Sequence, residues 1–220
     1  MGTSKTTMPL TFGKRLQGFA LTQLDRATHL LSQPQGKPDM AIHETRRSLK
    51  RLRALLRLIQ PDLPATLYHR DNLYLRNIGR QLSALRDAAV VEETFAALKK
   101  QFSAQLPQCV WHELKATLAA PARATDELMQ QRMIAVAAKL RIARARIEKW
   151  PLEVDDLNVF VQGLRKSYRR GRRALGEAQQ QPSATSFHEW RKQVNHLRYQ
   201  LQLLQTLRLA KVKPTLRAFK

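Results

Sequence analysis

Two segments of the chain each combine one histidine with closely spaced arginine and lysine residues. The first spans residues 42–60 and reads IHETRRSLKRLRALLRLIQ. Its leucines and isoleucines recur at the i, i+3, i+4, i+7 spacing of an amphipathic helix, so the cations gather on the opposite, solvent-facing side. Guanidinium groups bind phosphate oxygens through two parallel hydrogen bonds, and lysine acts as a point charge. The residues that this segment offers to an anion are His43, Arg46, Arg47, Lys50, Arg51, Arg53 and Arg57.

The second segment, residues 187–205, repeats this pattern as FHEWRKQVNHLRYQLQLLQ. Its first histidine and first arginine fall 145 residues after their counterparts, and the Gln-Gly pair at residues 17–18 recurs at residues 162–163 by the same offset. Chance seldom aligns two helices at one offset, so the pattern indicates an internal duplication. The anion-binding candidates of this copy are His188, Arg191, Lys192, His196 and Arg198.

Two more segments carry cations at helical spacing. Because an α-helix repeats about every 5.4 Å along its axis, one basic stripe can engage several successive phosphate groups. If the two copies pack about a pseudo-twofold axis, their basic faces converge on one groove. The candidates on these segments are Arg76, Arg80, Arg165, Arg169, Arg172 and Arg173.

The overall charge favours a partner with many negative charges. Among the 220 residues, 39 Lys and Arg stand against 17 Asp and Glu, which gives a formal net charge of +22. Such an excess opposes compaction unless an anion binds, and it indicates nucleic acid, an acidic membrane surface or a phosphate polymer as the partner. Aromatic residues make up only 6% of the chain, which argues against stacking on single-stranded bases.

The chain shows no pattern of secretion or membrane insertion. Cys109 is the only cysteine, so no disulfide can form within the chain, which fits a reducing cytoplasm. The N-terminus lacks the apolar core of a signal peptide, and no run approaches the roughly 18 consecutive apolar residues of a membrane-spanning helix. We therefore expect a cytoplasmic protein that crosses no membrane.

The elements that position these residues are expected to be helices, because Leu, Ala, Gln and Arg dominate and strand-like alternation is nearly absent. Proline-containing breaks at residues 32–38, 61–64 and 179–183 separate them, and Asp39 is expected to cap the second helix. The predicted fold is all-α, with helices at about residues 10–33, 39–60, 65–87 and on towards 105, 107–121, 122–150, 155–179 and 183–209.

The predicted domain spans residues 10–210. A first helical unit with its connecting long helix covers residues 10–150, and a second unit covers residues 155–220. The last ten residues, KVKPTLRAFK, resemble only the start of a counterpart to the third helix, so the second unit is predicted to be incomplete. An incomplete unit leaves apolar surface that a second copy of the chain, as in a homodimer, or a repacked end must cover.

Several motifs occur in a characteristic order. His-x-x-Arg, then basic residues, then Leu-x-Arg lies on both histidine helices, Leu85-Arg86-Asp87 follows the first copy, and YRRGRRA at residues 168–174 precedes the second. In this order and spacing the motifs resemble the CHAD domain, the conserved histidine α-helical domain, over residues 10–210. Asn195 departs from the family pattern, because a basic residue is usual at its position.

The resemblance implies two helical bundles related by a pseudo-twofold axis, with basic residues lining a central groove. It also implies binding of inorganic polyphosphate and association with polyphosphate granules.

Catalysis finds little support in the sequence, which has no Walker loop and no carboxylate cluster for Mg²⁺. Both His-Glu pairs begin the zinc motif His-Glu-x-x-His, but Arg47 and Lys192 occupy the position of its second histidine. We expect a binding or localising protein without a cofactor, a metal or enzymatic activity. Two alternatives stay open: a nucleic-acid-binding helical protein, and a non-catalytic accessory subunit of a separate phosphate-metabolising enzyme.

Overall fold

The computed structural model describes residues 11–33, 38–103, 105–119, 126–152 and 157–207, without the side chains of residues 84–93, 119, 126 and 157. Within these ranges the chain forms helices and short connections and contains no strand, so the predicted all-α fold is confirmed. The elements are α1 (Phe12–Ser32), α2 (Pro38–Leu58), the 3₁₀ turn η1 (Gln60–Asp62), α3 (Ala65–Phe102), α4 (Gln108–Ala119), α5 (Asp126–Ile147), α6 (Leu157–Gln180) and α7 (Ala184–Thr206).

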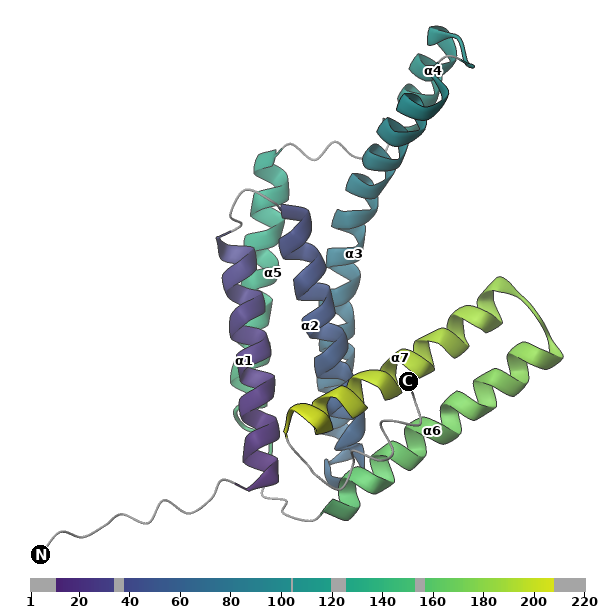
Figure 1. Ribbon diagram of the computed structural model, residues 1–220. Coiled ribbons are helices and arrows are strands. Elements are labelled where there is room, and N and C mark those ends of the chain that lie inside the picture. The colour runs from purple at the N-terminus through teal and green to yellow at the C-terminus, as the bar shows by residue number, and fades with distance from the viewer. Residues whose placement is uncertain (1–10, 34–37, 104, 120–125, 153–156, 208–220) are drawn as a thin grey trace, which may run out of the picture.

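Four helices form a closed bundle in which each packs against two neighbours (Figure 1). Both α1 and α3 contact α2 on one side and α5 on the other. The removal of their apolar faces from water is the main favourable contribution to this arrangement. The largest side chains of this core are fully buried and include Leu24, Leu52, Leu55, Ile78 and Leu140.

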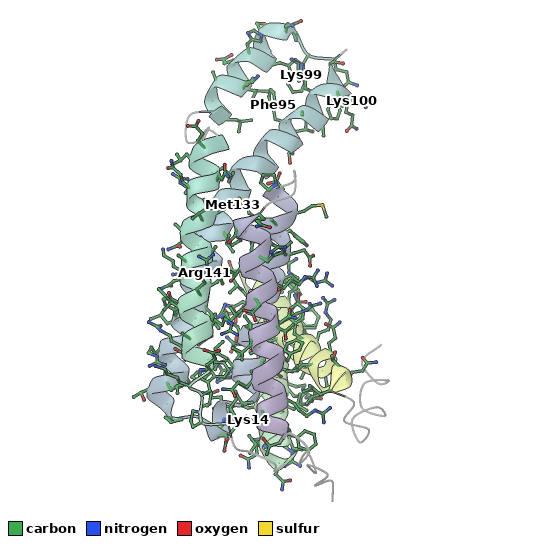
Figure 2. The ribbon with its side chains drawn as sticks, turned by 90° about the vertical axis from the view of Figure 1, so that its left-hand side faces the viewer. Lys14, Phe95, Lys99, Lys100, Met133 and Arg141 are labelled. Carbon is green, nitrogen blue, oxygen red and sulfur yellow. The ribbon has the colours of Figure 1, made fainter. Side chains whose placement is uncertain are left out.

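α3 is 38 residues long and continues beyond the bundle, where it pairs with α4 in a protruding hairpin (Figure 1). Phe95 of α3 meets Trp111 of α4 edge to face, with 5.7 Å between the ring centroids. Figure 2 shows Phe95, Lys99 and Lys100 in this hairpin, well separated from the bundle. The hairpin therefore offers basic residues that are remote from the histidine helices.

α6 and α7 form a second hairpin that lies across the bundle instead of within it (Figure 1). α7 packs on α2, and α6 packs on α2 and η1. Gln200 of α7 donates from Nε2 to the carbonyl oxygen of Ala54 at 3.1 Å, inside this interface. Arg15 of α1 donates to the carbonyl oxygen of Leu207 at 2.8 Å, so the end of α7 is also attached to α1.

The ends of the helices differ in detail from the sequence prediction. α2 begins at Pro38, so Asp39 lies inside the first turn and not at the N-cap. Proline suits the first helical position because it has no N–H to satisfy, and Asp39 still lies near the positive end of the helix. α5 ends at Ile147, earlier than expected, and Gln17 of α1 donates from Nε2 to the carbonyl oxygen of Ile147 at 2.8 Å.

The α1–α2 and α6–α7 pairs each contain one of the two repeated histidine helices, and they correspond along the chain. α6 starts 145 residues after α1, and α7 starts 146 residues after α2. Their pseudo-twofold relation and the division into two units remain predictions. The expected incomplete end at residues 211–220 lies outside the described residues, as do the side chains of the motif at residues 85–87.

Gly163 provides a test of how the α6–α7 hairpin is seated. A Cβ atom at this position would overlap the carbonyl oxygen of Leu58, whereas one at Gly171 of the same helix would meet nothing. We expect Gly163→Ala to lower the free energy of unfolding by about 1–3 kcal/mol, as overpacking does. Gly171→Ala should raise it by about 0.5–1 kcal/mol, because alanine is the better helix former.

Urea denaturation of both variants checks this expectation. Since the two substitutions add the same methyl group to the same helix, equal stability changes would contradict the close approach of α6 to α2.

Candidate functional site

The basic face of α2 becomes more enclosed along the helix. His43, Arg46, Lys50, Arg53 and Arg57 follow one another at intervals of three or four residues and therefore share one face. His43 and Lys50 are exposed and Arg46 is half-buried, whereas Arg53 and Arg57, at the end of the helix, are both half-buried. The change occurs where α6 and α7 cross α2, so the crossing hairpin encloses the cations at the end of the helix.

Cations from four helices meet at this crossing. Arg53 interacts electrostatically with Arg76 and Arg80 of α3, and Arg57 interacts with Arg170 of α6. The positive charges of Arg57, Arg53 and Lys192 also act electrostatically on the ring of His196 on α7. We call this group the central cluster; it consists of Arg53, Arg57, Arg76, Arg80, Arg170 and Lys192.

Among the described residues, no carboxylate forms an ion pair with either half-buried arginine of the central cluster, and only Glu189 attracts Arg57 from a greater distance. Burial, followed by repulsion from Arg57, Arg76 and Arg80, lowers the pKa of Arg53 to about 10, so its guanidinium stays protonated at neutral pH. Burial is also the main reason that the pKa of Arg57 is lowered.

Their side-chain partners are neutral. Arg53 donates from Nε to Oδ1 of Asn72 at 3.1 Å, and Arg57 donates to Oε1 of Gln193 at 3.4 Å. Among the described residues neither guanidinium forms an ion pair with an acid. An anion placed beside them would relieve the repulsion and replace lost hydration.

A groove of about 360 Å³ opens beside Arg57. Two acids lie in it, and each is held by a cation: Glu177 by Arg173 at 3.3 Å, and Glu189 by Lys192 at 2.7 Å. The hydrogen bond from Lys192 is the main cause of the lowered pKa of Glu189. The groove is lined by Arg57, Gln60, Tyr68, His69, Asn72, Arg170, Arg173, Ala174, Glu177, Glu189 and Gln193.

The outer face of α6 forms a second basic groove of about 570 Å³. Arg170 and Arg173 line this groove as well as the first, so the two grooves are continuous across α6. The other residues of the second groove are Gln162, Arg165, Lys166 and Arg169.

This face of α6 has lost the packing role of its counterpart. At the offset of 145 residues, Arg165 and Arg169 correspond to Ala20 and Leu24, which are fully buried in the bundle. Arg165 and Arg169 are exposed instead. At this offset α6 therefore presents cations where α1 presents core residues.

His196 does not lie on the exposed face on which the sequence pattern placed it. The crossing of α7 over α2 turns this side chain inwards, and it is 7% exposed with no hydrogen-bond partner at either ring nitrogen. Burial, followed by the charges of Arg57, Arg53 and Lys192, lowers the pKa of His196 to about 3, so the ring is neutral at pH 7. His196 is therefore a buried, neutral residue beside the central cluster, and it cannot act as a surface cation.

The remaining candidates lie outside the two grooves. Arg47 is bound to Glu44 at 3.5 Å, and Arg51 donates to Oε1 of Gln23 at 3.4 Å, so Arg51 is directed to α1. His43, Arg46 and Lys50 precede Arg53 on α2. The remaining candidates on α6 and α7 are all exposed: Arg172, His188, Arg191 and Arg198.

Arg170 and Gln193 are groove residues that the sequence analysis did not select. Arg170 lies within the basic run of α6, but nothing in the run distinguishes it from Arg169 or Arg172. Only the packing of α6 against α2 and η1 turns Arg170 towards Arg57.

The described part of the chain contains no group of three His, Cys, Asp or Glu side chains arranged to hold a metal ion. None of its helices combines the length and the apolar character needed to cross a bilayer.

A comparison with models of known protein families matched the CHAD domain over residues 20–220. The chain belongs to the CHAD-domain family. Searches of curated proteins and of solved structures found no match. The CHAD match includes both histidine helices and every residue of the two basic grooves. The resemblance inferred from the motif order is thereby confirmed.

The burial of His196 predicts a loss of stability in acid. Because its pKa is about 3 in the folded chain and 6.5 by ordinary values, the unfolded chain binds more protons between these limits. The free energy of unfolding should therefore fall as the pH drops from 7 to 5. Phenylalanine fills a similar space without titrating, so His196→Phe should lose less stability over the same range.

Urea denaturation at pH 7 and pH 5 measures both losses. His112→Phe, at an exposed position on α4, is the control and should retain the full wild-type loss. A pH dependence that His196→Phe leaves unchanged would contradict a buried, neutral histidine.

Proposed function

We propose that this CHAD-domain protein binds inorganic polyphosphate through the central cluster and the outer face of α6. It acts as a non-catalytic module and localises to polyphosphate granules. The observation that carries the proposal is the half-buried pair Arg53 and Arg57, whose hydrogen-bond partners are the neutral side chains of Asn72 and Gln193. Such a pair gains most from a ligand that brings dense negative charge.

The shape of the basic surface favours a polymer over a single phosphate. Polyphosphate carries about one negative charge on each phosphate along an extended chain, and helical spacing repeats donors at about 5.4 Å. The two basic grooves share Arg170 and Arg173, so one polymer chain could contact both without a break in the cationic surface. Four of the six residues that line the second groove are arginines, and three arginines also line the first groove, which suits bidentate binding of phosphate oxygens.

The acids of the groove support a binding role. Enzymes of phosphoryl transfer use carboxylates to hold metal ions. Glu177 and Glu189 are each engaged by a cation on the same helix, Arg173 and Lys192. Release of orthophosphate from polyphosphate by the purified chain would overturn the non-catalytic part of the proposal.

The first test is a competition between polyanions. We expect labelled long-chain polyphosphate to bind better than single-stranded RNA or duplex DNA at equal phosphate concentration and physiological salt. Binding should weaken steeply with salt, with a slope of about −0.7 per phosphate neutralised on a single strand. Replacing Arg76 and Arg80 by Gln should weaken polyphosphate binding and make its dependence on salt concentration shallower, because both residues belong to the central cluster.

The matched control replaces Lys99 and Lys100 by Gln. It removes the same charge from the same helix, but in the protruding hairpin (Figure 2). Equal effects of the two double variants would show attraction by net charge alone. Equal competition by RNA or DNA would favour the nucleic-acid alternative.

A second test separates ligand binding from structure at Arg53. We expect Arg53→Met to leave the melting temperature of the free protein unchanged or to raise it, because repulsion with Arg57, Arg76 and Arg80 is removed. The rise in melting temperature on adding polyphosphate should be smaller than in the wild type, because the ligand binds more weakly. Thermal unfolding with and without polyphosphate measures both quantities.

Arg141→Met, on the exposed side of α5, is the control and should keep the wild-type response to polyphosphate. If Arg53→Met lowers the melting temperature of the free protein and leaves the response intact, Arg53 has a structural role only.

A further inference from the structure

A groove of different chemistry lies between α3 and α5. Figure 2 shows α5 on the side of the bundle away from α7. α3 also lines the first basic groove, through Tyr68, His69 and Asn72, so the two grooves share this helix but no lining residue. The groove has a volume of about 430 Å³. It is lined by Leu67, Arg70, Ile142, Ala145, Arg146 and Lys149.

The floor of this groove is apolar and its rim is cationic. Leu67 comes from α3, and Ile142 and Ala145 come from α5. Ile142 is 49% exposed, so part of the apolar floor faces solvent in the described part of the chain. Cations come from both walls, Arg70 from α3 and Arg146 and Lys149 from α5.

A buried acid holds two of the rim cations in place. Asp71 is 3% exposed and accepts from Nε1 of Trp150 at 2.8 Å and from Nε of Arg70 at 2.8 Å. Arg146 lies 4.0 Å from the same carboxylate, and its guanidinium lies 4.2 Å from the ring centroid of Tyr74. One carboxylate thus orients two arginines, and the rim retains a net positive charge with Lys149.

We propose that this groove docks an acidic amphipathic α-helix of a partner protein. A trough between two packed helices accepts the apolar ridge of a third helix, and acidic residues on both flanks of that ridge would meet the cations on both walls. Ile142 to Lys149 covers about two helical turns, or about 10 Å. The partner helix would therefore place apolar side chains at i, i+4 and i+7 between Asp or Glu residues.

The chemistry separates this occupant from the other candidates. Polyphosphate has no apolar surface and would gain nothing from Leu67, Ile142 and Ala145. A second copy of the chain would bring a net charge of +22 towards a cationic rim. A membrane meets protruding apolar side chains more readily than the floor of a groove.

The test uses a labelled synthetic peptide of about 20 residues with leucines at helical spacing between glutamates, long enough to form a helix. A control peptide has the same composition in an order that spreads the leucines around the helix. Both are titrated into the full chain by fluorescence anisotropy, with polyphosphate present in excess to occupy the basic grooves. We expect the amphipathic peptide to bind with micromolar affinity and the control peptide about tenfold more weakly or worse.

Two matched variants locate the site. Ile142→Glu adds an acid inside the groove and should weaken binding of the amphipathic peptide about tenfold. Ile134→Glu adds the same acid on the same helix at a residue that is equally exposed, 50% against 49%, but outside the groove, and should leave binding unchanged.

Three outcomes would overturn the proposal. The control peptide could bind as well as the amphipathic one, which would show charge attraction alone. The two isoleucine variants could behave alike, which would place the peptide elsewhere. Vesicles with anionic lipids could bind in an Ile142-dependent way while the peptide does not, which would assign the groove to a membrane surface.

Discussion

Arg53 and Arg57 stand half-buried beside other cations, with neutral amides as partners, and this arrangement costs free energy when no anion is bound. Apolar burial at the crossing of α7 over α2 must offset that cost. Leu201, Leu203 and Leu204 are buried there. The rest of the site depends on this packing. If the α6–α7 hairpin packed less closely on α2, Arg53 and Arg57 would stay hydrated and apart from the other cations.

The seating of the hairpin depends on small residues and neutral polar contacts. Gly163 lets α6 approach the last carbonyl groups of α2, and Gln200 supplies a hydrogen bond to Ala54 inside the interface. His196 occupies the same interface as a neutral ring, since burial opposes its protonation. Positive charge is thus concentrated on one side of the interface between α2 and the α6–α7 hairpin, and the side chains buried inside this interface are neutral.

The two helices that the sequence repeat relates, α1 and α6, differ in what one of their faces presents. α1 has 21 residues and α6 has 24, and each is the first helix of a hairpin. The face that carries Ala20 and Leu24 in α1 carries Arg165 and Arg169 in α6. A helix with such a face cannot enter a bundle core, and it serves a cationic groove instead. The groove between α3 and α5 is built differently. One buried carboxylate, that of Asp71, orients two rim arginines, and Ile142 between the walls is exposed.

Local patterns were enough to predict the helices, the breaks between them, the repeated histidine segment and the family. Helical periodicity depends on residues three and four apart, and proline acts on its immediate neighbours, so both can be read along the chain. The pattern also selected Arg53 and Arg57, but it could not tell them from Arg51, which turns to α1. It equally missed Arg170 and placed His196 at the surface. The direction of Arg51 depends on how α1 packs against α2. The roles of Arg57, Arg170 and His196 depend on how α6 and α7 cross α2, because these residues lie more than 100 positions apart and only the tertiary structure brings them together.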